Sequence, residues 1–198
     1  MFELRFRSFT AAFDFSFFAA VTLLMLIGNN RYALFGLAAC IWHELGHFVV
    51  MRLCGISVKR LIFYGAGIKI IPDKQIDFTG FESQLAIFLA GSAANFVAAV
   101  LLSVSESPAV RIFAAVNSVI GAFNLLPLQY LDGGKILVLL IRNFCGFSLS
   151  CQLERYLKWL NIFLIVAVLT VFAIMGKGNF TLYLTLCCLL ISAVSADA

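Results

Sequence analysis

The sequence predicts an all-α polytopic membrane protein of about six transmembrane helices, with a small membrane-associated β-hairpin between the second and third. Composition is the first reason, because 63% of the 198 residues are hydrophobic and only 12% are charged. The mean hydropathy is +1.03, whereas a soluble domain usually has about a quarter of its residues charged. Span-length apolar runs and an uneven distribution of basic residues are the other two reasons. Together they predict a single transmembrane domain over residues 1–198.

Six apolar runs have the length that crosses a bilayer, about 17–25 residues. The first run follows Arg5 and Arg7, as the apolar part of a signal peptide would. No small-residue cleavage site follows it, so we expect it to be retained. The predicted spans are Ala11–Gly28, Ala33–Cys54, Gln84–Ser105, Ala109–Leu126, Tyr156–Gly176 and Asn179–Ser195.

The basic residues predict the orientation of these spans. Eleven of the fourteen lie at the N-terminus or in the connections around residues 52–80 and 135–158, and only Arg31, Arg111 and Lys177 lie in the opposite connections. Because basic residues favour the cytoplasmic side, both termini are predicted to be cytoplasmic. The net charge of +4 is explained by this topology, and no basic patch with interleaved aromatic residues indicates nucleic-acid binding.

Two connections carry further predictions. In residues 56–72, branched and aromatic side chains flank a predicted turn at Tyr64–Gly67, which indicates a hairpin at the membrane surface; the alternative is a plain surface loop. Residues 135–155 fit either a short interfacial helix or a re-entrant segment. The six cysteines lie in apolar spans or predicted cytoplasmic segments, so they do not indicate a disulfide framework.

The two histidines of the chain, His43 and His47, lie in one string, His43-Glu44-Leu45-Gly46-His47. Residues i and i+4 share a face of a helix, so both imidazoles can reach one Zn²⁺ with Glu44 beside it. The alternative is a packing pair, but ionisable groups inside a span are costly and usually functional. At about 1.5 Å per residue, His47 would lie about 10 Å from the cytoplasmic end of its helix.

A catalytic zinc site usually has three protein ligands and an open position. The third is expected to be Asp132, which follows Pro127 and precedes Gly133-Gly134 in a predicted tight turn on the same side of the membrane. The alternative is an ordinary Asp-Gly turn at a membrane surface. Glu44 would then be the general base, with a water polarised by one Zn²⁺ as the nucleophile.

These residues resemble the site-2 protease family of intramembrane zinc metalloproteases, peptidase family M50. That family has HExxH in one transmembrane helix and N-x-x-P-x-x-x-LDG in a later one. Both stand here, as residues 43–47 and as Asn124…Pro127…Leu131-Asp132-Gly133. The string Gly91–Asn95 is similar to a third, small-residue motif of the family, although it has Ser92 where proline is frequent.

The compact form resembles the stage IV sporulation factor FB protease subfamily most closely. No PDZ-like insertion and no C-terminal CBS domain is recognised in the sequence. The resemblance implies one Zn²⁺, an active site near the cytoplasmic face, and cleavage of a membrane-anchored protein in or near its transmembrane segment. It also implies that Asn95 and Asn124 contact the substrate. The alternative role is helix packing for Asn95 and capping of a turn for Asn124. A regulatory membrane partner is compatible with the resemblance.

Two other classes of function are weighed against this one. A catalytically silent zinc protein that binds or shelters membrane partners would usually have lost the glutamate of the motif, which is present here as Glu44. A zinc transporter usually needs several polar positions along a pathway, and the last two predicted spans have almost none.

Overall fold

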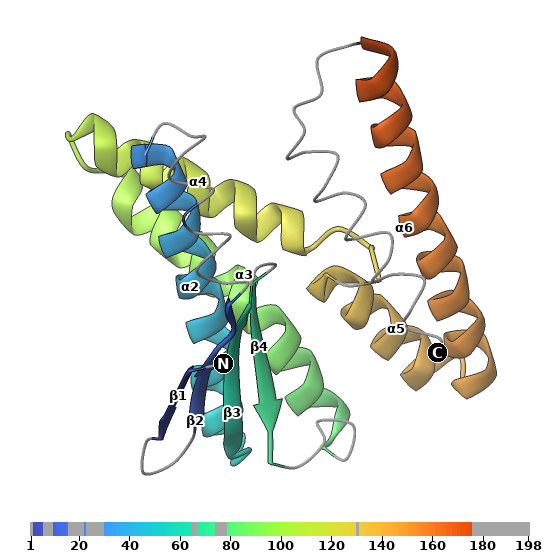
Figure 1. Cartoon of the computed structure of the whole chain (residues 1–198). Helices are drawn as coiled ribbons and strands as arrows, with labels where there is room; N and C mark the ends of the chain where they lie inside the picture. Colours follow the sequence, from blue (N-terminus) through green and yellow to red (C-terminus); the bar gives the residue numbers. More distant parts are fainter. Residues whose placement is uncertain are drawn as a thin grey trace. The chain divides into compact units, whose positions relative to one another are not determined.

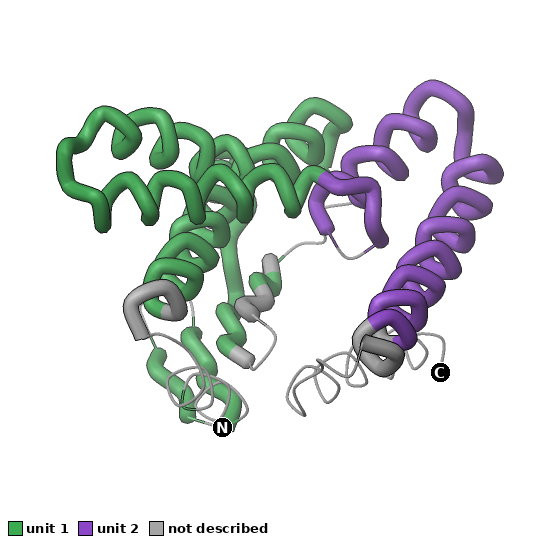
Figure 2. The backbone as a smooth tube through the Cα atoms, turned by 90° about the horizontal axis from the view of Figure 1, so that it is seen from above, with its two compact units in different colours: residues 1–125 green, residues 126–198 purple. Residues whose placement is uncertain are grey.

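The structure is a computed structural model that describes residues 2–5, 10–15, 22, 30–64, 67–73, 79–129 and 131–175. The described chain is mostly helical and contains one small sheet (Figure 1). Its internal contacts divide it into two compact units, residues 1–125 and 126–198 (Figure 2). Each unit is described by itself below.

Three helices form the body of the first unit. They are α2 (Asn30–Leu53), α3 (Phe81–Ser103) and α4 (Pro108–Asn124), and each packs on the other two. Small residues allow the helices to approach closely: a Cβ added at Gly46 of α2 would lie 2.6 Å from the Ala90 carbonyl oxygen of α3. Such contacts through small residues are typical of helices that pack inside a membrane.

Two helices of the described chain are long and apolar enough to cross a membrane. They comprise Leu34–Leu53, within α2, and Phe81–Ser103, which is α3. Large apolar side chains on the outer surface of α3 are more than half exposed, among them Val97, Val100 and Leu101. A helix with apolar residues on both its packed and its outer surface is typical of contact with lipid.

A four-stranded sheet completes the first unit, in the order β1 (Phe2–Arg5), β2 (Thr10–Phe13), β3 (Val58–Tyr64) and β4 (Gly67–Pro72). The pairs β1–β2 and β3–β4 are antiparallel, whereas β2 and β3 are parallel. One buried core joins the sheet to the helices, made by Met51, Ile56, Val58 and Ile87. The sheet is therefore attached to the C-terminal end of α2 and to the first half of α3.

The chain leaves α2 for the sheet through a regular C-terminal capping motif. Gly55 has φ of 76°, a conformation that favours glycine. The Ile56 N–H donates to the Met51 carbonyl at 2.9 Å, and the Gly55 N–H donates to the Arg52 carbonyl at 3.1 Å. These two bonds form a Schellman motif, which satisfies the last helical carbonyls and turns the chain into β3.

The second unit contains the helices α5 (Asp132–Phe144) and α6 (Phe147–Met175), which pack on each other. Gly146, with φ of 98°, lies in the short link between them. The N-terminal turn of α5 is unusually close to the preceding loop, because a Cβ added at Gly134 would collide with the Leu128 carbonyl. A residue larger than glycine would therefore open this turn.

The sequence prediction needs two corrections. The first predicted span, 11–28, begins too early, because residues 10–13 form β2 and pair with β3. The all-α description is also incomplete, because the predicted hairpin residues belong to a four-stranded sheet. The physical reason is the same in both cases: a short apolar run forms a strand as readily as the start of a helix, and its partner strand lies about 50 residues further along the chain.

The other predicted elements agree with the helices to different degrees. α2, α3 and α4 correspond to the predicted spans 33–54, 84–105 and 109–126 within about three residues. α6 covers the span predicted at 156–176 but begins at Phe147, and α5 with the start of α6 fills residues 135–155. The span predicted at 179–195 and the turn residues 65–66 lie outside the described residues. The six-span topology stays a prediction.

Candidate metal centre

The two histidines lie on one face of α2, and both side chains are buried, with 4% and 7% of their surface exposed. Their Nε2 atoms are 3.2 Å apart. The Nδ1 of His47 lies 2.7 Å from the Ile87 carbonyl oxygen of α3, and because a carbonyl only accepts, this nitrogen carries the proton. With the proton on Nδ1, Nε2 of His47 carries the lone pair that a metal ligand requires. This Nε2 atom faces Nε2 of His43.

Gly91 of α3 lies directly against this pair. A Cβ at this position would collide with Nε2 of His47 and would lie 2.6 Å from Nε2 of His43. Only glycine therefore leaves space at the two nitrogen atoms that would hold a metal. Because Ile87 is one helical turn before Gly91, the same face of α3 orients one ring and makes room for both.

Asp132 is the first residue of α5 and is 4% exposed. A carboxylate at a helix N-terminus is stabilised by the unpaired N–H groups and the positive end of the helix dipole. The Lys135 ammonium, three residues later, lies 3.1 Å from Oδ1 of Asp132. Both neighbours present positive charge to this carboxylate, and an ionised carboxylate is the form that binds a metal.

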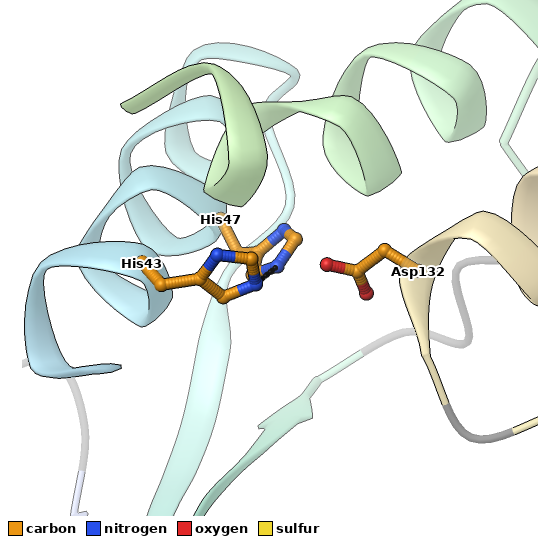
Figure 3. A group of neighbouring side chains, drawn as sticks. All are labelled: His43, His47 and Asp132. Carbon is orange, nitrogen blue, oxygen red and sulfur yellow. Dashed lines mark hydrogen bonds between the residues drawn. The ribbon is translucent and has the colours of Figure 1, made fainter. Parts of the chain in front are cut away.

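The described residues contain one group of three side chains that could hold a metal ion, and it consists of His43, His47 and Asp132. One candidate ligand atom from each lies within 4.8 Å of the other two. Figure 3 shows the two imidazole rings and the carboxylate directed toward one another. The structure thus brings together the three residues that the sequence predicted as ligands.

The other predicted site residues lie in different surroundings. Glu44 lies on α2 next to His43 and is partly buried. Asn124, the last residue of α4, is also partly buried, and its Nδ2 donates to the Ile120 carbonyl at 3.0 Å. Asn95 of α3 is fully buried at 0% exposure, so a contact with another protein would require its surroundings to open.

Two interactions of the site were not predicted. No residue pattern singles out Ile87, because its backbone carbonyl and not its side chain contacts His47. Its position one turn before the glycine of the small-residue motif was the only available signal. Lys135 contributes to the predicted orientation as a basic residue, and its spacing of three residues from Asp132 also places the two side chains together.

The donor set fits zinc. Two imidazole nitrogens and one carboxylate oxygen are ligands that Zn²⁺ accepts in catalytic sites, where a fourth position stays open. All three residues are buried, and Gly91 keeps the nitrogen atoms uncovered. The buried His–His–Asp group is consistent with a zinc site, on an apolar helical framework typical of membrane proteins.

A comparison with known protein families identifies the family of this chain. The sequence model of peptidase family M50 matches residues 32–108 and 103–168, which include every residue of the group. The chain belongs to peptidase family M50, a membrane-embedded family. The resemblance to site-2 proteases seen in the sequence motifs is thereby confirmed.

Two curated relatives are zinc metalloproteases by name. A zinc metalloprotease of Methanocaldococcus jannaschii is 26% identical over 153 residues, which cover 70% of this chain and 44% of the relative. The putative zinc metalloprotease Rip3 of Mycobacterium tuberculosis is 33% identical over 114 residues, covering 50% of this chain and 28% of the relative. The chain thus spans less than half the length of either relative.

A solved structure shares the fold. The site-2 protease from Methanocaldococcus jannaschii matches with a TM-score of 0.70 at 19% sequence identity. The match covers 98% of this chain and 94% of that one. At this identity, the likeness establishes the fold and not the activity.

Proposed function

We propose that this protein is an intramembrane zinc metalloprotease of the site-2 type. Its substrate would be a membrane-anchored protein, cleaved at a peptide bond in or near a transmembrane segment. The observation that carries the proposal is the buried group of His43, His47 and Asp132, with Glu44 next to a ligand in the sequence. Membership of peptidase family M50 and the names of the relatives support it.

Each residue has a distinct role in this proposal. His43, His47 and Asp132 would hold one Zn²⁺, which supplies Lewis-acid polarisation of water and of the scissile carbonyl. Glu44 would take the proton of the attacking water as general base and deliver it to the leaving amine. Gly91 would keep the ligand nitrogens accessible, and the Ile87 carbonyl would hold His47 in the required tautomer.

The substrate segment must reach the site in an extended form. A helix hides its carbonyl groups in hydrogen bonds between residues i and i−4, so a transmembrane substrate has to unwind locally before attack. Asn124, partly buried at the end of α4, is the better placed of the two proposed contacts to the substrate backbone. Asn95 could make such a contact only after α3 and α4 separate, because it is fully buried.

The proposed location follows the charge distribution. The protein would be a multi-pass protein of the cell membrane, with both termini in the cytoplasm and the site toward the cytoplasmic face. It would be one transmembrane protease domain. Its protein partners would be the membrane-anchored substrate and, where cleavage is triggered, a regulatory membrane protein.

The experiment compares the membrane proteomes of cells that express this chain and cells that express Glu44→Gln. The variant is expected to retain one zinc per chain and to lose cleavage, because glutamine cannot carry the proton. A single-pass protein that stays intact only with the variant would identify the substrate. Equal cleavage by both chains would contradict the role of Glu44.

A matched control removes the same charge elsewhere. Glu82, in the first turn of α3, is exposed and lies outside the metal group, so Glu82→Gln should cleave like the parent chain. Cleavage, measured together with zinc content, separates the competing class of protein. A chain that binds zinc but whose Glu44→Gln variant leaves every membrane protein unchanged would be either a zinc-binding protein without peptidase activity or a protease whose trigger is absent from those cells.

A further inference from the structure

Three buried polar side chains lie on α3 and α4, outside the metal group. Asn95 and Asn117 are each 0% exposed, and Ser92 is 1% exposed. Among the described residues, both amide atoms of Asn95, Oδ1 of Asn117 and Oγ of Ser92 make no hydrogen bond. Buried polar atoms without partners are costly, and those in native proteins are usually satisfied by ordered water.

The packing of the two helices brings these residues together. After the connection at residues 104–107, α4 returns alongside α3 (Figure 1). A Cβ added at Gly121 of α4 would lie 3.2 Å from Cβ of Asn95 and 3.3 Å from the Ser92 carbonyl oxygen. Asn117 is one helical turn before Gly121 on the same buried face of α4. From this spacing we infer that its side chain lies in the same helix contact.

The chemistry of the group identifies the ligand class. Asn95 offers both a donor and an acceptor without partners, whereas Asn117 offers only Oδ1, because its Nδ2 already donates to the Phe113 carbonyl at 2.9 Å. A cation would satisfy the oxygen atoms and leave the Asn95 N–H groups without an acceptor. Water both donates and accepts, and it needs about two to four polar partners, which this group supplies.

We propose that Ser92, Asn95 and Asn117 form an internal water site that joins α3 to α4. Ser92 directly follows Gly91, the residue that packs against both histidine rings, and Asn95 lies one helical turn further along α3. Bound water would therefore hold α3 in place at the level of the metal ligands. The proposal concerns resting structure and does not depend on the peptidase activity proposed above.

The direct test is an experimental structure of the full chain in detergent or nanodiscs, at a resolution that shows ordered water. Density for water is expected within hydrogen-bonding distance of at least two of Ser92 Oγ, the Asn95 amide and Asn117 Oδ1. A well-ordered contact between α3 and α4 that lacks such density would overturn the proposal.

Thermal unfolding of purified variants provides a second test that needs no substrate. Asn117→Leu keeps the side-chain shape and removes the amide. If water bridges the group, the substitution leaves that water and its other partners short of a hydrogen bond, so the unfolding temperature should fall by about 2–4 °C. If the group is dry, the substitution removes an unsatisfied polar atom, and the unfolding temperature should rise. A rise would overturn the proposal.

Two further comparisons support the interpretation of that result. Ser92→Ala should also lower the unfolding temperature, by more than Ser150→Ala, because the equally buried Ser150 hydroxyl already donates to the Phe147 carbonyl of its own helix at 2.7 Å. The double variant Asn95→Leu/Asn117→Leu should lose less than the sum of the two single variants, because they share the same water. Equal effects at the two serines, or strict additivity at the two asparagines, would count against a shared water.

Discussion

At the scale of single residues, the histidine pair depends on a glycine in another helix. Gly91→Ala should place a methyl group against both Nε2 atoms, so the rings must move or α3 must retreat. We expect zinc affinity to fall by about 10- to 100-fold, the range found when residues that support metal ligands are changed. Competition with a chelating indicator of known affinity would measure this loss.

The control for this substitution is Gly36→Ala, in α2. A Cβ at Gly36 would meet no atom within 4 Å, so this variant has the same change of residue type without the clash. It should bind zinc like the parent chain. If both variants bind zinc equally, the close contact of Gly91 with the histidines is not important for the metal site.

The role of Asp132 can be tested with a conservative change. Asp132→Asn keeps the size of the side chain but removes the charge that zinc and Lys135 would share. Zinc affinity should fall by more than about 100-fold, beyond the range for supporting residues, and cleavage should fall with it. Asp73→Asn, at an exposed position after β4, serves as the control. Unchanged zinc content in Asp132→Asn would remove Asp132 from the set of ligands.

The sequence was sufficient to predict that His43, His47 and Asp132 come together, because each part of the signal is local. The spacing of His43 and His47 is a property of one helix, and the turn around Asp132 is marked by Pro127 and Gly133-Gly134. The contact from the Ile87 carbonyl to His47 could not be predicted in this way. It depends on how α3 lies against α2, and backbone atoms leave no signature in residue type.

At the scale of elements, helices were easier to predict than strands. α2, α3 and α4 are long apolar runs, and run length alone separates them from loops. β1 and β2 have four residues each, and β2 is stabilised by parallel pairing with β3, which is distant in sequence. A short apolar segment without its partner has no distinguishing pattern, so residues 10–13 were assigned to a span.

The junction between α2 and β3 allows a test of local conformation. Gly55 has a positive φ but open space around it, so an added Cβ meets no atom within 4 Å. Gly55→Ala should therefore destabilise the protein only through backbone strain, by about 1 kcal/mol. Gly55→Asn should cost less, because asparagine tolerates this conformation better. Chemical or thermal unfolding of both variants would measure the difference, and equal losses would indicate that φ at this position is not the cause.

At the scale of the whole molecule, the central fact is that apolar surface faces outward while polar groups gather inside. The outer surface of α3 exposes valine and leucine, whereas His43, His47 and Asn95 are among the most buried residues of the described chain. This arrangement suits a lipid environment. Lipid tails are as apolar as leucine, so burying apolar side chains between helices does not stabilise the fold there as it would in water. For a reaction that consumes water, the water must then reach the site through the interior of the bundle or from one of its ends.

The end from which water enters depends on orientation, which the basic residues predict and labelling can test. In a background without other cysteines, chains that retain only Cys54 or only Cys145, both exposed in the structure, should react with a membrane-impermeant maleimide in inverted vesicles and not in intact cells. A cysteine introduced at the exposed Glu106, between α3 and α4, should show the opposite pattern. Because Cys54 follows the helix that holds both histidines, labelling of Cys54 from inside places their helix end at the cytoplasmic face. Labelling of Cys54 in intact cells would show that the predicted orientation is wrong. Water and substrate would then have to approach the metal group from the other side of the membrane.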